Sequence, residues 1–143
     1  MAKRKKHGIR WWKKKTWDVF SKYIRLRDAL ATTGRRDFLI CCTCQKPYPA
    51  FGIGCAQAGH FIPSRGNAIL FDERGVHGQC YNCNIVLKGD WPEYYKFMMT
   101  KHGLEIINEL LLLKKTVRKY SVSELEELHD KYKQKIADLE SGE

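Results

Sequence analysis

The stretch Val76-His-Gly-Gln-Cys-Tyr-Asn-Cys-Asn84 contains a Cys-x-x-Cys hook with an asparagine directly after it. A matching hook runs from Cys41 to Cys44. Two such hooks supply four thiolates at a spacing that suits a tetrahedral zinc ion, and four protein ligands leave no open position for catalysis. We therefore predict one structural zinc, bound by Cys41, Cys44, Cys80 and Cys83. A redox role for the first hook alone would leave the second hook unexplained.

The remaining sequence indicates a soluble protein in a reducing compartment. The basic start of the chain has no apolar run behind it, so it does not resemble a secretory signal. The longest apolar run, Leu110 to Leu113, is too short to span a bilayer. We expect a cytoplasmic protein without membrane contact, in which thiols and metal are favoured over disulfides. Cys42 and Cys55 lie outside the hooks, and we expect both to be small core residues.

Positive charge is concentrated at one end of the chain. The net charge is +10, and residues 1–36 hold 13 of the 26 Lys and Arg with only two acidic residues. This asymmetry predicts a polyanionic partner, most simply DNA, although a solubilising tail is the alternative. We interpret residues 1–15 as a flexible DNA-contacting arm, in which the tryptophans either stack on bases or anchor the arm to the core. Its predicted DNA contacts are Lys3, Arg4, Lys5, Lys6, Arg10, Trp11, Trp12, Lys13, Lys14 and Lys15.

Residues 16–143 are expected to form a single, mainly helical α+β domain. Apolar periodicity predicts a helix over 16–31, with Lys22, Arg25 and Arg27 left for solvent or DNA, and a strand over 37–40. Two further strands, 58–62 and 68–71, are expected around a turn, followed by helical segments at 82–87, 92–101 and 103–115. Ser123 and Glu126 match a capping box for a last helix.

An apolar stripe runs along that last helix. Its residues recur at three- and four-residue steps: Leu125, Leu128, Tyr132, Ile136 and Leu139. Such a stripe packs on the body of the same chain or pairs with a second copy, and two heptads are short for an independent coiled coil. We therefore expect intrachain packing, with dimerisation through the stripe as the alternative.

Three polar residues near the hooks could carry chemistry. A neutral imidazole at His60 could take a proton from an attacking water, whereas a histidine packed in the core is the alternative. The amide oxygen of Asn84 suits a hard metal ion, although an asparagine at a helix start is also an ordinary cap. His77 is a candidate metal ligand or phosphate contact, or else a packed residue of the zinc turn.

These residues together resemble a known family. The first hook, the segment Ala58-Gly-His-Phe61, the segment Phe71-Asp-Glu-Arg74 and the stretch Val76 to Asn84 are similar to the phage NinG family, also called Rap. More distantly, the hooks and the Cys-x-x-Cys-Asn ending resemble phage endonuclease VII and the HNH, or ββα-metal, nucleases. The resemblance implies a zinc-stapled ββα-metal core at residues 37–90, flanked by the N-terminal helix and by C-terminal helices at 92–140.

The resemblance also implies a function. The NinG family is associated with phage recombination and with cutting branched DNA, such as Holliday junctions, flaps and D-loops. Carried over to this chain, His60 matches the general base and Asn84 the last ligand of a catalytic magnesium or manganese. Two positions depart from the HNH pattern. Gly59 replaces the metal-binding Asp or His that usually precedes the base, and Gly75 replaces the middle asparagine. Either His77, Asp72 or Glu73 completes the metal site, or the active site is built differently.

The leading hypothesis is a structure-selective, metal-dependent endodeoxyribonuclease, acting as a homodimer if it cuts paired strands. Arg65 and Arg74, near the expected site, are added to its DNA contacts. The runner-up is a non-catalytic, zinc-stabilised DNA-binding recombination accessory protein, kept open by Gly59 and Gly75. A third alternative is an RNA-binding or RNA-cleaving protein, since a basic aromatic arm recognises charge and stacking rather than the sugar.

Overall fold

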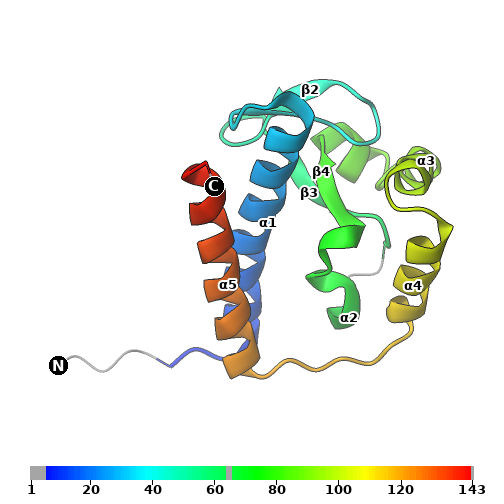
Figure 1. The fold of residues 1–143 in the computed structure, drawn as a ribbon. Coiled ribbons are helices and arrows are strands. Elements are labelled where there is room, and N and C mark those ends of the chain that lie inside the picture. Colours follow the sequence, from blue (N-terminus) through cyan, green and yellow to red (C-terminus); the bar gives the residue numbers. More distant parts are fainter. Residues whose placement is uncertain (1–5, 64–65, 143) are drawn as a thin grey trace.

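The computed structural model describes residues 6–63 and 66–142, so that Lys3, Arg4, Lys5 and Arg65 lie outside the described residues. The chain folds into helices and short strands, and helices predominate (Figure 1), as expected for a mainly helical α+β protein. In chain order the elements are α1 (Ile9–Thr33), β1 (Phe38–Ile40), β2 (Pro47–Pro49), β3 (Gln57–His60), α2 (Asn67–Leu70), the 3-10 turn η1 (Glu73–Gly75), β4 (Val76–Gln79), the π-helical turn η2 (Asn82–Val86), α3 (Trp91–Lys101), α4 (Leu104–Lys114) and α5 (Val122–Glu140).

Helix α1 starts earlier than the sequence predicted. It begins at Ile9 and ends at Thr33. The next residue, Gly34, forms a left-handed cap with a φ of 72° and a bond from its N–H to Leu30 O. The expectation of a flexible arm over residues 1–15 is therefore wrong for residues 9–15, which form the first turns of the helix. Lysine and arginine are good helix formers, and this stretch contains neither glycine nor proline. Thr16 does not start the helix; it is buried, and its hydroxyl donates to Leu125 O at 3.0 Å.

Helices α1 and α5 lie side by side (Figure 1). The apolar stripe of α5 packs on α1 of the same chain, as expected, and the rings of Phe20 and Tyr132 meet edge to face at 4.9 Å. The capping box is formed by Ser121 and Glu124, so its predicted position at Ser123 and Glu126 is wrong by two residues. Each backbone N–H of the Ser121–Glu124 pair donates to the other residue's side chain, which fixes the start of α5.

An antiparallel hairpin, β3 with β4, lies between the α1–α5 pair and the α3–α4 pair (Figure 1). Its register pairs Gly59 with His77 and His60 with Val76. The predicted strand over 68–71 is wrong, because Asn67–Leu70 is the short helix α2 and β3 pairs instead with β4. A short apolar run does not distinguish strand from helix by periodicity. The partner of β3 could therefore not be read from local pattern.

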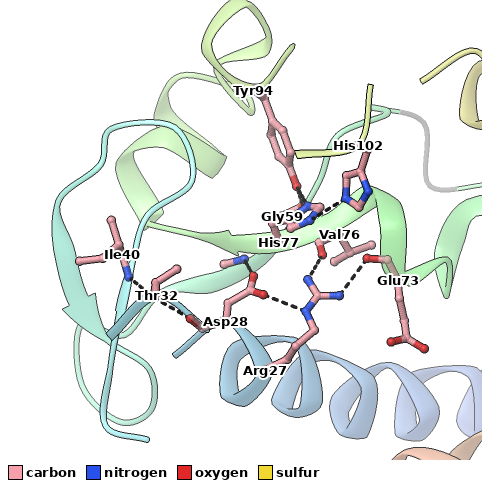
Figure 2. A network of polar contacts seen from close by, with 11 residues as sticks. Arg27, Asp28, Thr32, Ile40, Gly59, Glu73, Val76, His77, Tyr94 and His102 are labelled. Carbon is pink, nitrogen blue, oxygen red and sulfur yellow. Dashed lines mark hydrogen bonds and ion pairs between the residues drawn. The ribbon is translucent and has the colours of Figure 1, made fainter. Parts of the chain in front are cut away.

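Charged side chains on α1 bind the hairpin (Figure 2). Asp28 Oδ2 accepts from the backbone N–H of Gly78 at 2.7 Å, and Asp28 Oδ1 accepts from Arg27 Nε at 2.8 Å. The guanidinium of Arg27 also donates to Glu73 O and Val76 O, at 2.9 and 2.7 Å. The expectation that Arg27 faces solvent or DNA is therefore wrong, since it holds the turn before β4 against α1.

Helices α3 and α4 close the other side of the molecule. Tyr94, Met98, Ile107 and Leu110 are buried with Phe61 in one apolar cluster. Both helices lie within about one residue of their predicted bounds, with Gly103 between them in a conformation at φ 91° that favours glycine. Across residues 6–63 and 66–142, no helix combines the length and the apolar character that a membrane crossing requires.

Candidate functional site

The four hook cysteines converge on one point. The Sγ atoms of Cys41, Cys44, Cys80 and Cys83 all lie within 4.8 Å of one another, and Cys44 Sγ is 3.9 Å from Cys80 Sγ. A tetrahedral zinc with Zn–S bonds of about 2.3 Å would separate its sulfurs by about 3.8 Å. The cluster therefore has the donor set and the size to hold a structural zinc ion.

Backbone amides around the cluster favour thiolates. Cys80 N–H donates to Cys41 Sγ at 3.3 Å, and Cys83 N–H donates to Cys80 Sγ at 3.4 Å. Burial alone would raise the pKa of Cys41, but bonds from the backbone of Cys44 and from Thr43 outweigh it and lower that pKa to about 7. The thiolate is the form that binds metal, so this environment prepares Cys41 as a ligand. Burial instead raises the pKa of Cys44 and of Cys83, whose thiols would lose their protons on binding the metal.

The two cysteines outside the hooks differ. Cys42 is buried in the apolar cluster of α3 and α4, as expected, and burial raises the pKa of its thiol. Cys55 is only half-buried, so the expectation of a core position is wrong for it. Its Sγ lies 3.6 Å from Arg25 Nη1 and borders a cleft.

This cleft has a volume of about 630 Å³ and brings His60 and Asn84 together. Successive side chains of the two-stranded sheet point to opposite faces, yet Gln57, Ala58 and His60 all border the cleft. The cleft therefore runs along the unpaired edge of β3. Its lining is Trp17, Ser21, Arg25, Cys55, Ala56, Gln57, Ala58, His60, Pro63, Asn84, Ile85, Lys88 and Gly89.

Trp17 and Leu70 are among the neighbours that orient the imidazole of His60. It stacks on the indole of Trp17, with ring centroids 5.0 Å apart and an interplanar angle of 17°. Its Nε2 lies 3.1 Å from Leu70 O. Because a carbonyl oxygen only accepts, Nε2 carries the proton of the neutral ring, and the lone pair is on Nδ1. The ring is therefore in the tautomer in which Nδ1 can accept a proton.

Asn84 lies inside η2, directly after Cys83. The residue at the cap position before η2 is Tyr81, and no side chain caps the start of this turn. The alternative that Asn84 is a helix cap is therefore wrong. Its Nδ2 donates to Gln57 Oε1 at 2.7 Å. A Cβ added to Gly59 would lie 3.1 Å from Asn84 Oδ1, so the amide oxygen is directed at Gly59.

His77 is not part of this cleft. It is 1% exposed and belongs to a buried chain of polar contacts (Figure 2). Tyr94 Oη donates to Gly59 O at 2.6 Å, so it accepts from His77 Nδ1 at 3.2 Å, and His77 Nε2 lies 3.4 Å from His102 Nε2. Burial first, and then the cation of Arg27, holds the pKa of His77 well below its usual range. The structure therefore places His77 in the interior, outside the lining of the cleft that Asn84 borders.

The two carboxylates expected as alternative ligands also lie elsewhere. Asp72 accepts from Arg74, and Glu73 accepts from Tyr132 and Lys135. Both border a second cavity, of about 640 Å³, formed with α5. Arg74 is paired with Asp72 and Glu109, so its charge is compensated by two carboxylates.

Three basic residues of α1 lie on the same helix face as Trp17, which borders the cleft. Arg10, Lys13 and Lys14 are three, four or seven residues before Trp17, the spacing that places side chains on one face of a helix. Trp11 is 37% exposed and stacks on His7 at 3.6 Å, with Lys15 Nζ 5.4 Å from its ring. Trp12 instead meets His129 of α5 at 5.8 Å and anchors the helix. One tryptophan therefore faces outward, while the other packs inward.

Several residues border the cleft that the sequence had not singled out for it, among them Trp17, Ser21, Arg25 and Lys88. The four-residue spacing of Trp17, Ser21 and Arg25 was the signal that could have placed them together on α1. Lys88 gave no comparable signal, because its position depends on the turn after η2.

The fold and the site define a small α+β protein with a four-cysteine cluster beside a basic cleft. The family model described as "Bacteriophage Lambda NinG protein" matches residues 1–143, and the chain belongs to the NinG family. Protein ninG of Escherichia phage 933W and protein ninG of Enterobacteria phage VT2-Sa are each 29% identical over 135 residues, which is 92% of this chain. The chain spans 60% of the length of each of these relatives. No solved structure matches.

The similarity to the NinG family that the hooks suggested is thus confirmed. The more distant resemblance to endonuclease VII and the HNH nucleases stays a prediction.

Proposed function

We propose that the protein is a metal-dependent endonuclease that cuts branched DNA formed during phage recombination. The observation that carries the proposal is that His60 and Asn84 border one cleft together with the basic side chains of Arg25 and Lys88. A proton acceptor, a hard oxygen ligand and positive charge in one cleft are the groups that phosphodiester hydrolysis requires.

His60 would act as the general base. Its Nδ1 takes one proton from a water molecule while the water oxygen forms a bond to phosphorus. The bond from phosphorus to the 3′ oxygen breaks in the same displacement. The contact of Nε2 with Leu70 O and the stack on Trp17 hold the ring in the tautomer and orientation that this step needs.

Asn84 would hold the catalytic cation. Its amide oxygen is a ligand type that magnesium and manganese accept, and it comes from a turn that the zinc cluster fixes. A bound divalent ion would neutralise charge on the phosphate and on the departing 3′ oxygen. Lys88, which is exposed, and Arg25 would contact the phosphates beside the cut.

The basic face of α1 would extend DNA binding beyond the cleft. Arg10, Lys13 and Lys14 share their helix face with Trp17, and the described residues before Trp17 include no carboxylate. DNA that follows this face would reach His60. Cutting both strands of a junction would require a second copy of the chain, so we include a homodimer in the proposal.

A non-catalytic DNA-binding accessory protein is the second candidate. One observation favours it: the position before His60 is Gly59, which has no side chain to bind metal. This candidate keeps the zinc cluster and the basic face but predicts no cutting under any metal.

The test uses labelled four-way-junction, flap and linear duplex DNA, incubated with zinc-loaded protein and with magnesium or manganese. We expect metal-dependent cutting of the branched substrates by the wild type and its loss in His60→Ala. His129→Ala, a histidine on α5, is the matched control and should cut normally. Junction binding without cutting by the wild type would favour the accessory protein, and cutting retained by His60→Ala would exclude His60 as the base.

A further inference from the structure

In the side-chain amide of Gln79, the nitrogen is hydrogen-bonded, whereas the oxygen has no donor among the described residues. Gln79 is the last residue of β4 and is 0% exposed. Its Nε2 donates to Gly89 O at 2.8 Å and to Thr43 Oγ1 at 3.2 Å. Because Gly89 O can only accept, these bonds fix which end of the amide is the nitrogen. Among the residues that the structure describes, none donates to Gln79 Oε1.

That oxygen is directed at Gly59. A Cβ added to Gly59 would lie only 2.2 Å from Gln79 Oε1 and 3.1 Å from Asn84 Oδ1. Two amide oxygens from different elements therefore converge beside the same glycine. Asn84 uses its Nδ2 on Gln57, and its oxygen accepts no hydrogen bond from the described part of the chain.

A buried acceptor without a donor is rare in folded proteins, because burial removes its water without returning a bond. The amide oxygens of Gln79 and Asn84 both lie beside Gly59, and each carries a partial negative charge. Hard divalent cations are bound by oxygens of this kind, including the amide carbonyls of Asn and Gln. Of these two residues, Asn84 borders the cleft that contains His60, and Gln79 meets Asn84 beside Gly59.

We infer that Gln79 is an oxygen ligand, together with Asn84, of the divalent cation in the cleft. The inference rests on the proposed function and deepens it, because it says how the site is built without a side chain at position 59. Gln79 reaches from β4 into the space that a ligand on β3 would otherwise fill. A Cβ at position 59 would displace Gln79 Oε1, so glycine there keeps the oxygen of Gln79 in place.

The direct test is binding of Mn²⁺ to the zinc-loaded full chain, followed by electron paramagnetic resonance and calorimetry. Gln79→Met keeps the length of the side chain but removes its oxygen, and it should weaken Mn²⁺ binding at least tenfold. Gln79→Glu supplies a carboxylate oxygen but loses the bond from Nε2 to Gly89 O, so it should bind Mn²⁺ more tightly than Gln79→Met. Gln134→Met, on the exposed surface of α5, is the matched control and should bind normally.

Zinc content and circular dichroism are measured for each variant, so that misfolding is recognised. If Gln79→Met does not fold, the comparison passes to Gln79→Ala and the double variant Gly59→Asp/Gln79→Ala. The truncation makes room for the new carboxylate, so the double variant should recover the Mn²⁺ binding that Gln79→Ala loses. Failure of the double variant to improve on Gln79→Ala would overturn the inference.

The inference and the proposed function fail in different ways. If the wild type binds Mn²⁺ and cuts junctions, but Gln79→Met binds equally well, then Gln79 is not a ligand and only the inference is overturned. If the wild type neither binds Mn²⁺ nor cuts, the proposed function falls and the inference falls with it.

Discussion

The cysteine cluster and the cleft share one turn, residues 80–84, but they are built from opposite kinds of groups. The cluster gathers four sulfurs, three of them from buried cysteines, and backbone N–H groups surround them. The cleft presents an imidazole and amide oxygens at the open edge of β3. A closed set of charged ligands directs the energy of metal binding into folding, whereas neutral ligands in an open cleft leave a metal exchangeable. One short turn thus serves both stability and the proposed chemistry.

The largest expected effect comes from breaking the cluster. Cys44→Ser, or removal of zinc with a chelator, should unfold the centre of the protein, because structural zinc contributes on the order of 10 kcal/mol in small zinc folds. Thermal melting by circular dichroism, with zinc content by mass spectrometry, measures the effect. Cys55→Ser is the matched control, since Cys55 lies outside the cluster. A zinc-free protein with an unchanged melting curve would contradict the structural role of the cluster.

The next effect separates the cleft from the cluster within the same turn. Asn84→Ala should lower the cleavage rate by about 100-fold or more, because loss of an outer-shell partner alone costs about 10- to 100-fold in metal sites. Its melting temperature should stay close to that of the wild type. Asn82→Ala is the control, because Asn82 is exposed in the same turn. An Asn84→Ala variant that unfolds like Cys44→Ser would show that the two regions are not separable.

A smaller effect tests whether the DNA-binding surface extends from the cleft along α1. Replacing Lys13 and Lys14 by Gln should reduce the slope of log affinity against log salt concentration by about 2, since each phosphate contact contributes about 0.9. Fluorescence anisotropy on junction DNA at several salt concentrations measures the slope. The same double change at Lys114 and Lys115, at the exposed end of α4, should leave it unaltered. Equal slopes in both double variants would remove α1 from the DNA-binding surface.

The smallest effect concerns His77, which belongs to the interior rather than to the cleft. Burial depresses its pKa, so below about pH 6.5 the unfolded chain binds a proton that the folded protein does not. This residue should therefore lower the free energy of unfolding as the pH falls, by at most about 1.4 kcal/mol per pH unit.

Denaturant unfolding from pH 7 to pH 5, with zinc in excess, should thus show a shallower decline for His77→Gln than for the wild type. Cleavage by this variant at neutral pH should be unchanged. A His77→Gln variant that keeps its stability but loses cleavage would return His77 to the active site.

Sequence patterns predicted the features that depend on local spacing. The hooks predicted the cysteine cluster, and the stripe of α5 predicted its apolar face. The pairing of β3 with β4 was not predictable in this way, because the intervening Asn67–Leu70 reads equally as strand or helix.

The roles of the two hairpin histidines were equally hidden in the sequence. His60 and His77 both lie on the hairpin, yet contacts with Trp17 and with Tyr94 decide which one borders the cleft. The position of the Gln79 amide oxygen depends on three residues that are distant in the sequence, so no spacing of residues could have predicted it.

The pairing of α1 with α5 has a consequence for how the chain acquires its structure. The bond from the Thr16 hydroxyl to Leu125 O joins residues 109 positions apart, and the largest apolar cluster draws on both helices. During synthesis, the inner face of α1 must therefore wait until α5 has left the ribosome before it is covered. Contacts of such long range are slow to form, and the uncovered surface is prone to aggregation. We expect closure of this helix pair to be the late, rate-limiting event in folding.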